Sequence, residues 1–266
     1  MIRLAAHRGG ARLWPENSLR AFRESLALGV DLLELDVHLT ADGEVVVIHD
    51  ATLERTTDGH GAVGERTVAE LARVRLRDPG GVLTDERLPT LRDVLAMVAP
   101  SPAGLLVEVK GPVAGVNVIF ERGHGDARIT PGPAYPGLVA KTLDLLRRAS
   151  MLERANVMGF SPDVLAETRA LAPGVPTTFL VAAAHVRSVD ARPEAPSAWA
   201  ARLGATDLGI QHTLAGPELM AAARAAGLRV GVWTVNDEDS MRRVIAAGVD
   251  VLTTDRPDLA RRVLGR

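Results

Sequence analysis

Short runs of β-branched and aliphatic residues alternate with amphipathic stretches along almost the whole chain, and this alternation limits the possible folds most strongly. Between many of the runs, apolar residues recur every three or four positions, as they do on one face of a helix. A strand followed by a helix, repeated in one series, predicts a parallel β/α architecture. The predicted strands are Ile2–Ala6, Leu32–Val37, Val45–His49, Leu105–Val109, Val157–Phe160, Thr177–Leu180, Asp207–Ile210, Val230–Val235 and Val251–Thr254.

The α/β fold that best fits this series is a TIM (β/α)8 barrel in a single domain, 1–266. Eight βα units in about 250 residues are typical of that barrel, and no linker divides the 266 residues. The nine predicted strands exceed the eight strands of a TIM barrel by one. Either the pair Leu32–Val37 and Val45–His49 is an irregular part of the barrel, or Asp207–Ile210 is not a barrel strand. A doubly wound sheet is the rival fold, but no G-x-G-x-x-G loop follows the first strand.

Two long segments interrupt the series of strands and helices. Ala51–Pro89 is polar, and we expect it to form a small insertion after the strand that ends at His49-Asp50. Gly111–Pro136 is rich in glycine and proline and follows another strand end, so we expect a loop that could act as a lid. Long loops after barrel strands belong to the catalytic face of the barrel.

The overall charge excludes several classes of partner. The chain has 31 basic and 33 acidic residues, so no basic field would hold nucleic acid or an anionic membrane. No apolar run reaches the roughly 18 residues of a membrane span, and the first residues do not have the pattern of a signal peptide. We therefore expect a cytoplasmic protein without a stable membrane anchor, acting on a small molecule. The absence of cysteine excludes thiolate metal sites.

Charged side chains and histidines gather at the C-terminal ends of the first four predicted strands. Residues two apart on a strand share a face, so each such pair projects its side chains to one side. In a TIM barrel these strand ends carry the active site. The clusters are His7-Arg8-Gly9, Glu34 with Asp36, His49-Asp50, and Glu108 with Lys110.

These residue types point to metal-assisted phosphoryl chemistry. Acids inside an apolar strand are costly to bury without a cation. Glu34, Asp36 and Glu108 would offer hard oxygen ligands, which suit Ca²⁺ or Mg²⁺ better than zinc. The two histidines can supply one proton acceptor and one donor near neutral pH. Arg8 and Lys110 add the positive charge that a phosphoryl oxyanion needs.

With these motifs, the chain resembles the glycerophosphodiester phosphodiesterases, a TIM-barrel family that hydrolyses phosphodiesters of glycerol. The resemblance covers nearly the whole chain, and the order and spacing of the motifs agree together. The matching residues are His7-Arg8-Gly9, Pro15-Glu16-Asn17-Ser18, Glu34-Leu35-Asp36-Val37, Thr40-Ala41-Asp42-Gly43, Val46-Val47-Ile48-His49-Asp50, Leu53-Glu54-Arg55-Thr56-Thr57, Glu108-Val109-Lys110, Trp233-Thr234-Val235-Asn236 and Thr254-Asp255-Arg256-Pro257.

The resemblance implies a role for each matching site residue. It implies a glycerophosphodiester substrate, an acid/base pair, substrate-binding residues and ligands for Ca²⁺, Mg²⁺ or Mn²⁺. The acid/base pair is His7 and His49. The substrate-binding residues are Arg8, Lys110 and Trp233, and the metal ligands are Glu34, Asp36 and Glu108. Asn17 matches a buried position of the family, and we expect it to cap the first helix.

Several alternatives stay open. The nucleophile is either water or the glycerol 2-hydroxyl, which would form a cyclic phosphate; we favour the hydroxyl, with His49 as the general acid. A lyase acting on phospholipids and a non-catalytic barrel that binds phosphodiesters are the rival functions. We expect the remaining histidines to be solvent or loop residues, with His124 on the lid able to meet substrate: His38, His60, His124, His185 and His212.

Overall fold

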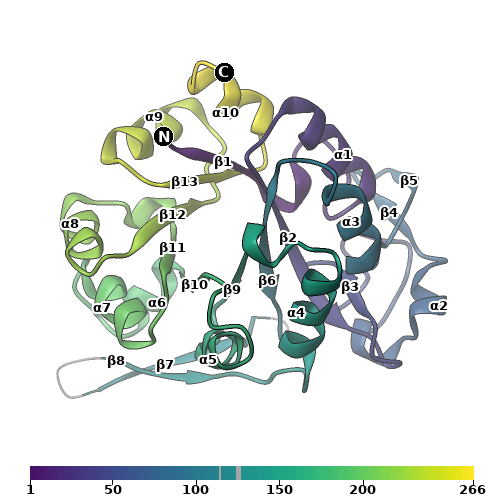
Figure 1. Ribbon diagram of the computed structural model, residues 1–266, viewed down its shortest axis with the longest axis horizontal. Helices are drawn as coiled ribbons and strands as arrows, with labels where there is room; N and C mark the ends of the chain where they lie inside the picture. The colour runs from purple at the N-terminus through teal and green to yellow at the C-terminus, as the bar shows by residue number, and fades with distance from the viewer. Residues whose placement is uncertain (114, 124–126) are drawn as a thin grey trace.

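The protein, seen in a computed structural model that describes residues 1–113, 115–123 and 127–266, is built around a closed barrel. Within these residues, eight parallel strands form the barrel and helices surround it, which confirms the predicted fold (Figure 1). The first strand pairs with both the second and the last, and this closes the barrel. In order around it, the strands are β1 (Arg3–Ala6), β2 (Leu32–Leu39), β6 (Gly104–Val109), β9 (Ala155–Gly159), β10 (Thr177–Val181), β11 (Asp207–Gln211), β12 (Arg229–Trp233) and β13 (Val251–Thr254).

The surplus predicted strand lies outside the parallel barrel. It is β3 (Val45–Val47), which pairs antiparallel with the end of β2 after the turn at Asp42-Gly43. Gly43 has a φ of +80°, the left-handed conformation that glycine adopts at no steric cost. Asp207–Gln211 does form a barrel strand, between β10 and β12. The irregular pair was therefore the correct one of the two alternatives.

Helices cover the outside of the barrel, and the larger ones are amphipathic. None of the helices in the part of the chain that the structure describes is long and apolar enough to cross a membrane. The α-helices around the barrel are α1 (Leu19–Leu28), α3 (Leu91–Val98), α4 (Leu138–Arg148), α5 (Pro162–Leu171), α6 (Ala183–Ser188), α7 (Ala195–Arg202), α8 (Pro217–Ala225), α9 (Glu238–Ala247) and α10 (Pro257–Val263). Short 3-10 helices are η1 (His7–Gly9), η3 (Leu152–Arg154) and η4 (His212–Leu214).

Alternation along the strands divides the core into a layer under the helices and a barrel interior. On β2, Leu33 and Leu35 belong to the large apolar cluster that includes the helices. Leu32 belongs to a smaller cluster inside the barrel. Glu34 and Asp36 follow Leu32 at a spacing of two, so they face the same interior. The apolar filling of the barrel therefore gives way to carboxylates toward the C-terminal end of β2.

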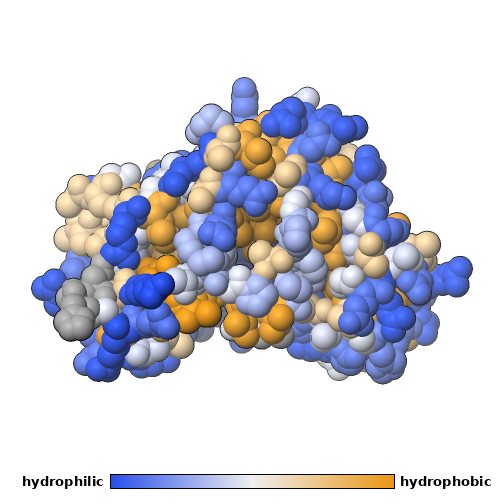
Figure 2. Space-filling view, turned by 90° about the horizontal axis from the view of Figure 1, so that it is seen from below, coloured by the Kyte–Doolittle hydropathy of each residue, from blue (hydrophilic) through white to orange (hydrophobic). Residues whose placement is uncertain are grey.

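The two interrupting segments have structures of their own. The segment 51–89 contains η2 (Val63–Glu65), α2 (Val68–Leu71) and the hairpin β4 (Arg75–Arg77) with β5 (Leu83–Arg87), around a small separate core. In 111–136, β7 (Val118–Arg122) and β8 (Ala127–Pro131) form a second hairpin that contacts α5 and α6 and extends to the lower left in Figure 1. Figure 2 views the molecule from below and shows hydrophilic residues over most of this face, with hydrophobic residues near its middle. His124 lies outside the described residues.

Candidate active site

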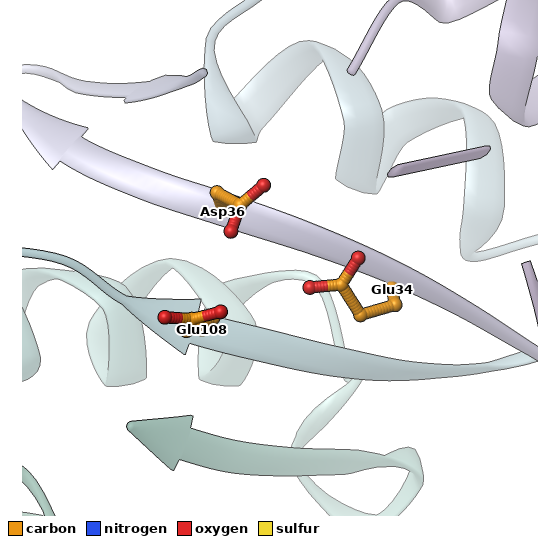
Figure 3. A group of neighbouring side chains, drawn as sticks. All are labelled: Glu34, Asp36 and Glu108. Carbon is orange, nitrogen blue, oxygen red and sulfur yellow. The ribbon is translucent and has the colours of Figure 1, made fainter. Parts of the chain in front are cut away.

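Three buried carboxylates meet at the C-terminal ends of two neighbouring strands. Glu34 and Asp36 come from β2 and Glu108 from β6, and each offers an oxygen within 4.8 Å of the others (Figure 3). The register explains the meeting, because Asp36 lies directly beside Glu108 in the β2–β6 ladder. Hard oxygen donors in this number suit a divalent cation such as Ca²⁺ or Mg²⁺.

Burial, mutual repulsion and a buried lysine set the charges of this carboxylate cluster. Burial and the neighbouring Asp36 raise the pKa of Glu34 to about 8. Burial acts against the charge of Asp36, but Lys110 and other cations outweigh it and hold the pKa of Asp36 well below its usual range. Lys110 Nζ lies 2.6 Å from Glu108 Oε1 and 3.1 Å from Asp36 Oδ1. Oδ1 of Asp36 is therefore ion-paired with Lys110, although no described residue donates a hydrogen bond to it. A metal ion bound here would share these carboxylate oxygens with Lys110.

Arg8 is held against the same cluster by its backbone and its side chain. Its backbone N–H donates to Glu34 Oε2 at 2.8 Å, and its Nε lies 3.3 Å from Asp36 Oδ2. Arg8 has a φ of +50°, a left-handed conformation that few non-glycine residues adopt. The next residue must be glycine, because a Cβ on Gly9 would lie 2.7 Å from the Cβ of Ala21. The His-Arg-Gly sequence therefore forms a tight turn that points Arg8 inward.

His7 forms a hydrogen-bonded pair with Asp255, from the opposite end of the chain. Nδ1 of His7 lies 2.6 Å from Asp255 Oδ1, while Asn236 Nδ2 donates to the other carboxylate oxygen at 2.7 Å. Burial opposes ionisation, but the hydrogen bond with His7 holds the pKa of Asp255 below its ordinary value. An ionised carboxylate only accepts, so Nδ1 carries the hydrogen. Nε2, 3.9 Å from Glu34 Oε2, is then free to take a proton.

His49 has a matching carboxylate in Asp50, at 2.6 Å from its Nδ1. Arg55 binds Asp50 through Nε and Glu16 through both of its terminal nitrogens. Glu16 also accepts from Arg8 at 3.0 Å, so one chain of ion pairs joins the two sides of the site. No role was predicted from the sequence for these partners, although all four stand within the quoted motifs: Glu16, Asp50, Arg55 and Asp255.

Two expectations about neighbouring residues were wrong. His38 is buried on β2, where Nε2 lies 3.0 Å from the carbonyl oxygen of His49, and burial lowers the pKa of His38 to about 4. The β2 strand runs to Leu39, beyond its predicted end, and this places His38 inside the fold. Asn17 does not cap the first helix; Ser18 does, accepting from Ala21 N. Asn17 instead donates to Asp36 Oδ2 at 2.9 Å.

The predicted residues surround one cavity of about 130 Å³. Its charged wall contains all but one of the predicted ionisable residues, and Asp36 lies just behind it. The opposite wall is apolar and includes Phe160 and Trp233, whose rings meet edge to face at 5.8 Å. The buried Nε1 of Trp233 has no partner among the described residues. No described residue of 111–136 lines this cavity, and a larger hollow of about 910 Å³ beside the β7–β8 hairpin holds none of the predicted residues.

Known proteins share both the sequence and the fold. A sequence model of the glycerophosphoryl diester phosphodiesterase family matches residues 7–259. The chain is 30% identical to a glycerophosphodiester phosphodiesterase of Caldanaerobacter subterraneus subsp. tengcongensis over 254 residues, 95% of this chain and 93% of that protein. The crystal structure of a glycerophosphodiester phosphodiesterase from Agrobacterium tumefaciens aligns with a TM-score of 0.76 at 27% identity, covering 98% of this chain and all of that one. A phosphodiesterase of Oleispira antarctica shares the fold, with a TM-score of 0.78 at 23% identity over 99% of this chain and 97% of its own. The chain therefore belongs to the glycerophosphoryl diester phosphodiesterase family, whose members are phosphoric diester hydrolases.

Proposed function

We propose that this protein hydrolyses glycerophosphodiesters to glycerol 3-phosphate and an alcohol, using a divalent cation and two histidines. The observation that carries the proposal is the convergence of His7, His49 and the carboxylate cluster on one small cavity. The Oleispira antarctica phosphodiesterase, which shares the fold, holds the product sn-glycerol-3-phosphate. The metal among Ca²⁺, Mg²⁺ and Mn²⁺ and the cytoplasmic location stay predictions.

Glu34, Asp36 and Glu108 would hold the cation. When bound, a divalent cation neutralises a phosphate oxygen and lowers the pKa of a coordinated hydroxyl. Lys110 and Arg8 lie against the same carboxylates and would hold two further phosphate oxygens. Their charges would stabilise the negative charge that grows on phosphorus oxygens during the displacement.

His7 is the better placed general base and His49 the better placed general acid. Nε2 of His7 lies beside Glu34, where the phosphorus and its nucleophile would sit. His49 stands on another strand end and is more open, with 31% of its side chain exposed against 16% for His7. A leaving alcohol departs through the more open side, so His49 would protonate it. Each proton transfer contributes roughly 10²–10⁴ in rate.

We propose the glycerol 2-hydroxyl as the nucleophile. His7 takes its proton, the 2-oxygen bonds to phosphorus, and the alcohol oxygen leaves with the proton of His49, which produces a cyclic phosphate. Water then opens the ring: His49 takes a proton from water, and His7 returns its proton to the 2-oxygen. A substrate analogue without the 2-hydroxyl should not turn over, and an unchanged rate on it would exclude this route in favour of direct attack by water.

The decisive assay measures release of glycerol 3-phosphate from glycerophosphocholine and glycerophosphoethanolamine. We expect release with added Ca²⁺, Mg²⁺ or Mn²⁺, none with chelator, and none from His7→Ala or His49→Ala protein that still folds. Full activity in either variant would remove that histidine from the pair. A cyclic product that is never opened, formed from a phospholipid, would favour the lyase instead.

A further inference from the structure

The backbone of His49 is anchored by a second histidine that takes no part in the proposed reaction. Strand β3 ends at Val47, so no strand ladder holds the carbonyl group of His49. That carbonyl instead meets Nε2 of His38 at 3.0 Å. Asp50 holds the ring of His49, and His38 holds its main chain. The position of the imidazole therefore depends on both contacts.

The hydrogen-bond partners determine the tautomer of His38. A carbonyl oxygen only accepts, so the hydrogen of the His38 ring must be on Nε2. Nδ1 then carries a lone pair and accepts from the hydroxyl of Tyr135 at 3.2 Å. His38 is 1% exposed, so bulk solvent does not reach either nitrogen. Tyr135 thus fixes His38 in the form that can donate to His49.

Tyr135 belongs to the segment 111–136, and its ring rests on the other insertion. A Cβ on Gly64, in η2, would lie 3.0 Å from Tyr135 Cε1 and 3.3 Å from its hydroxyl. The ring also meets His38 edge to face, with centroids 5.7 Å apart. Both insertions therefore fix the position of the Tyr135 hydroxyl. This hydroxyl contacts His38, which in turn contacts the backbone of His49.

We propose that His38 and Tyr135 are positioning residues that hold His49 where it protonates the leaving alcohol. The inference rests on the proposed function, in which His49 is the general acid. Displacing a catalytic group by about 1 Å can cost on the order of 10²-fold in rate. Loss of either positioning residue should therefore slow the departure of an alcohol that needs a proton. It should hardly affect a leaving group that departs as a stable anion.

The test compares two substrates that share glycerol 3-phosphate: glycerophosphoethanolamine, with an alkoxide leaving group, and the p-nitrophenyl ester, with a stable phenolate. In His38→Leu we expect the single-turnover rate of leaving-group release, which precedes ring opening, to fall about 10- to 100-fold on the first substrate and less than about 3-fold on the second. Tyr135→Phe should show the same asymmetry at about 3- to 10-fold. His38→Gln, which can still donate and accept, should restore most of the rate. Ser197→Ala is the matched control, because it removes a buried hydroxyl bond in α7, away from the site.

Each outcome decides the inference. Tyr135→Phe keeps the volume of the ring, and His38→Gln keeps the polar contacts. Equal losses of rate on both substrates in either variant would overturn the positioning role. Unchanged rates in all the variants would overturn it too. The His49→Ala variant distinguishes a failure of the acid assignment of His49 from a failure of the positioning role of His38 and Tyr135. If His49→Ala itself shows no preference for the p-nitrophenyl ester, the assignment of His49 as acid fails and the inference fails with it. If His49→Ala shows that preference and the His38 variants do not, only the positioning role is wrong.

Discussion

The ring of His7 lies 2.6 Å from the carboxylate of Asp255, although 248 positions separate the two residues in the chain. Barrel closure makes this contact. Strands β1 and β13 pair in parallel, with Ala6 beside Thr254, so the residues that follow them emerge side by side. Closing the barrel therefore assembles the proposed base with the carboxylate that orients it.

Asp255→Asn should reduce kcat by about 10²-fold or more with little change in KM. The amide can still bond to His7, but it presents a donor as well as an acceptor and no longer stabilises the charged imidazolium. Steady-state kinetics on glycerophosphoethanolamine would measure this. Asp258→Asn, which alters a carboxylate paired with Arg256 and Arg262, provides the control. A kcat near that of the wild type would show that His7 needs no orienting partner.

Glu16→Gln should weaken both substrate binding and turnover. Glu16 accepts hydrogen bonds from Arg8 and from Arg55. A neutral amide at this position would no longer balance the positive charges of the two arginines. We expect KM to rise about 10-fold, because Arg8 would lose the partner that aims it at phosphate. Arg55→Lys, which keeps the charge, should lie between Glu16→Gln and the wild type. If KM stays constant in Glu16→Gln, the ion-pair chain does not orient Arg8.

Metal affinity should increase with pH between about 6 and 8, because Glu34 must lose a proton before it can bind the cation. Its pKa of about 8 means that the metal-free site still holds that proton at neutral pH. Calorimetry in buffers of different ionisation enthalpy should detect about one proton released for each ion bound. Glu108→Gln should lower the affinity about 10- to 100-fold, whereas Glu24→Gln, exposed on α1, should leave it unchanged. Equal affinity at pH 6.5 and 8.5 would contradict this.

His38 should make the folded protein sensitive to mild acid. The unfolded chain binds a proton at this residue below about pH 6.5, whereas the folded protein does so only near pH 4. The stabilisation is therefore complete above about pH 6.5 and is lost as the pH falls toward 4, by on the order of 3 kcal/mol. His38→Gln should show a flatter stability profile over this range in urea unfolding, whereas exposed His60→Gln should follow the wild type. Parallel profiles for His38→Gln and the wild type would refute the assignment.

The barrel and the polar residues at the C-terminal ends of its strands could be predicted from the sequence because both depend on local patterns. The alternation of strands and helices predicted the fold, and the spacing of two predicted that Glu34 and Asp36 share a face. The same reasoning could not choose between β3 and β11 as the surplus strand. Both are short apolar runs, and only pairing in three dimensions distinguishes an antiparallel addition from a barrel strand.

By itself, the sequence determined which chemical groups stand at the strand ends, because side-chain alternation and strand order follow from residues near one another in the chain. Only the tertiary structure decided which partner each group has. His7 meets Asp255, Arg8 meets Glu16, and His38 is buried against the main chain of His49. The physical reason is that these contacts arise from barrel closure and from two insertions packing on the same strand ends. Their geometry depends on atoms that are distant in the chain, and no local pattern encodes it.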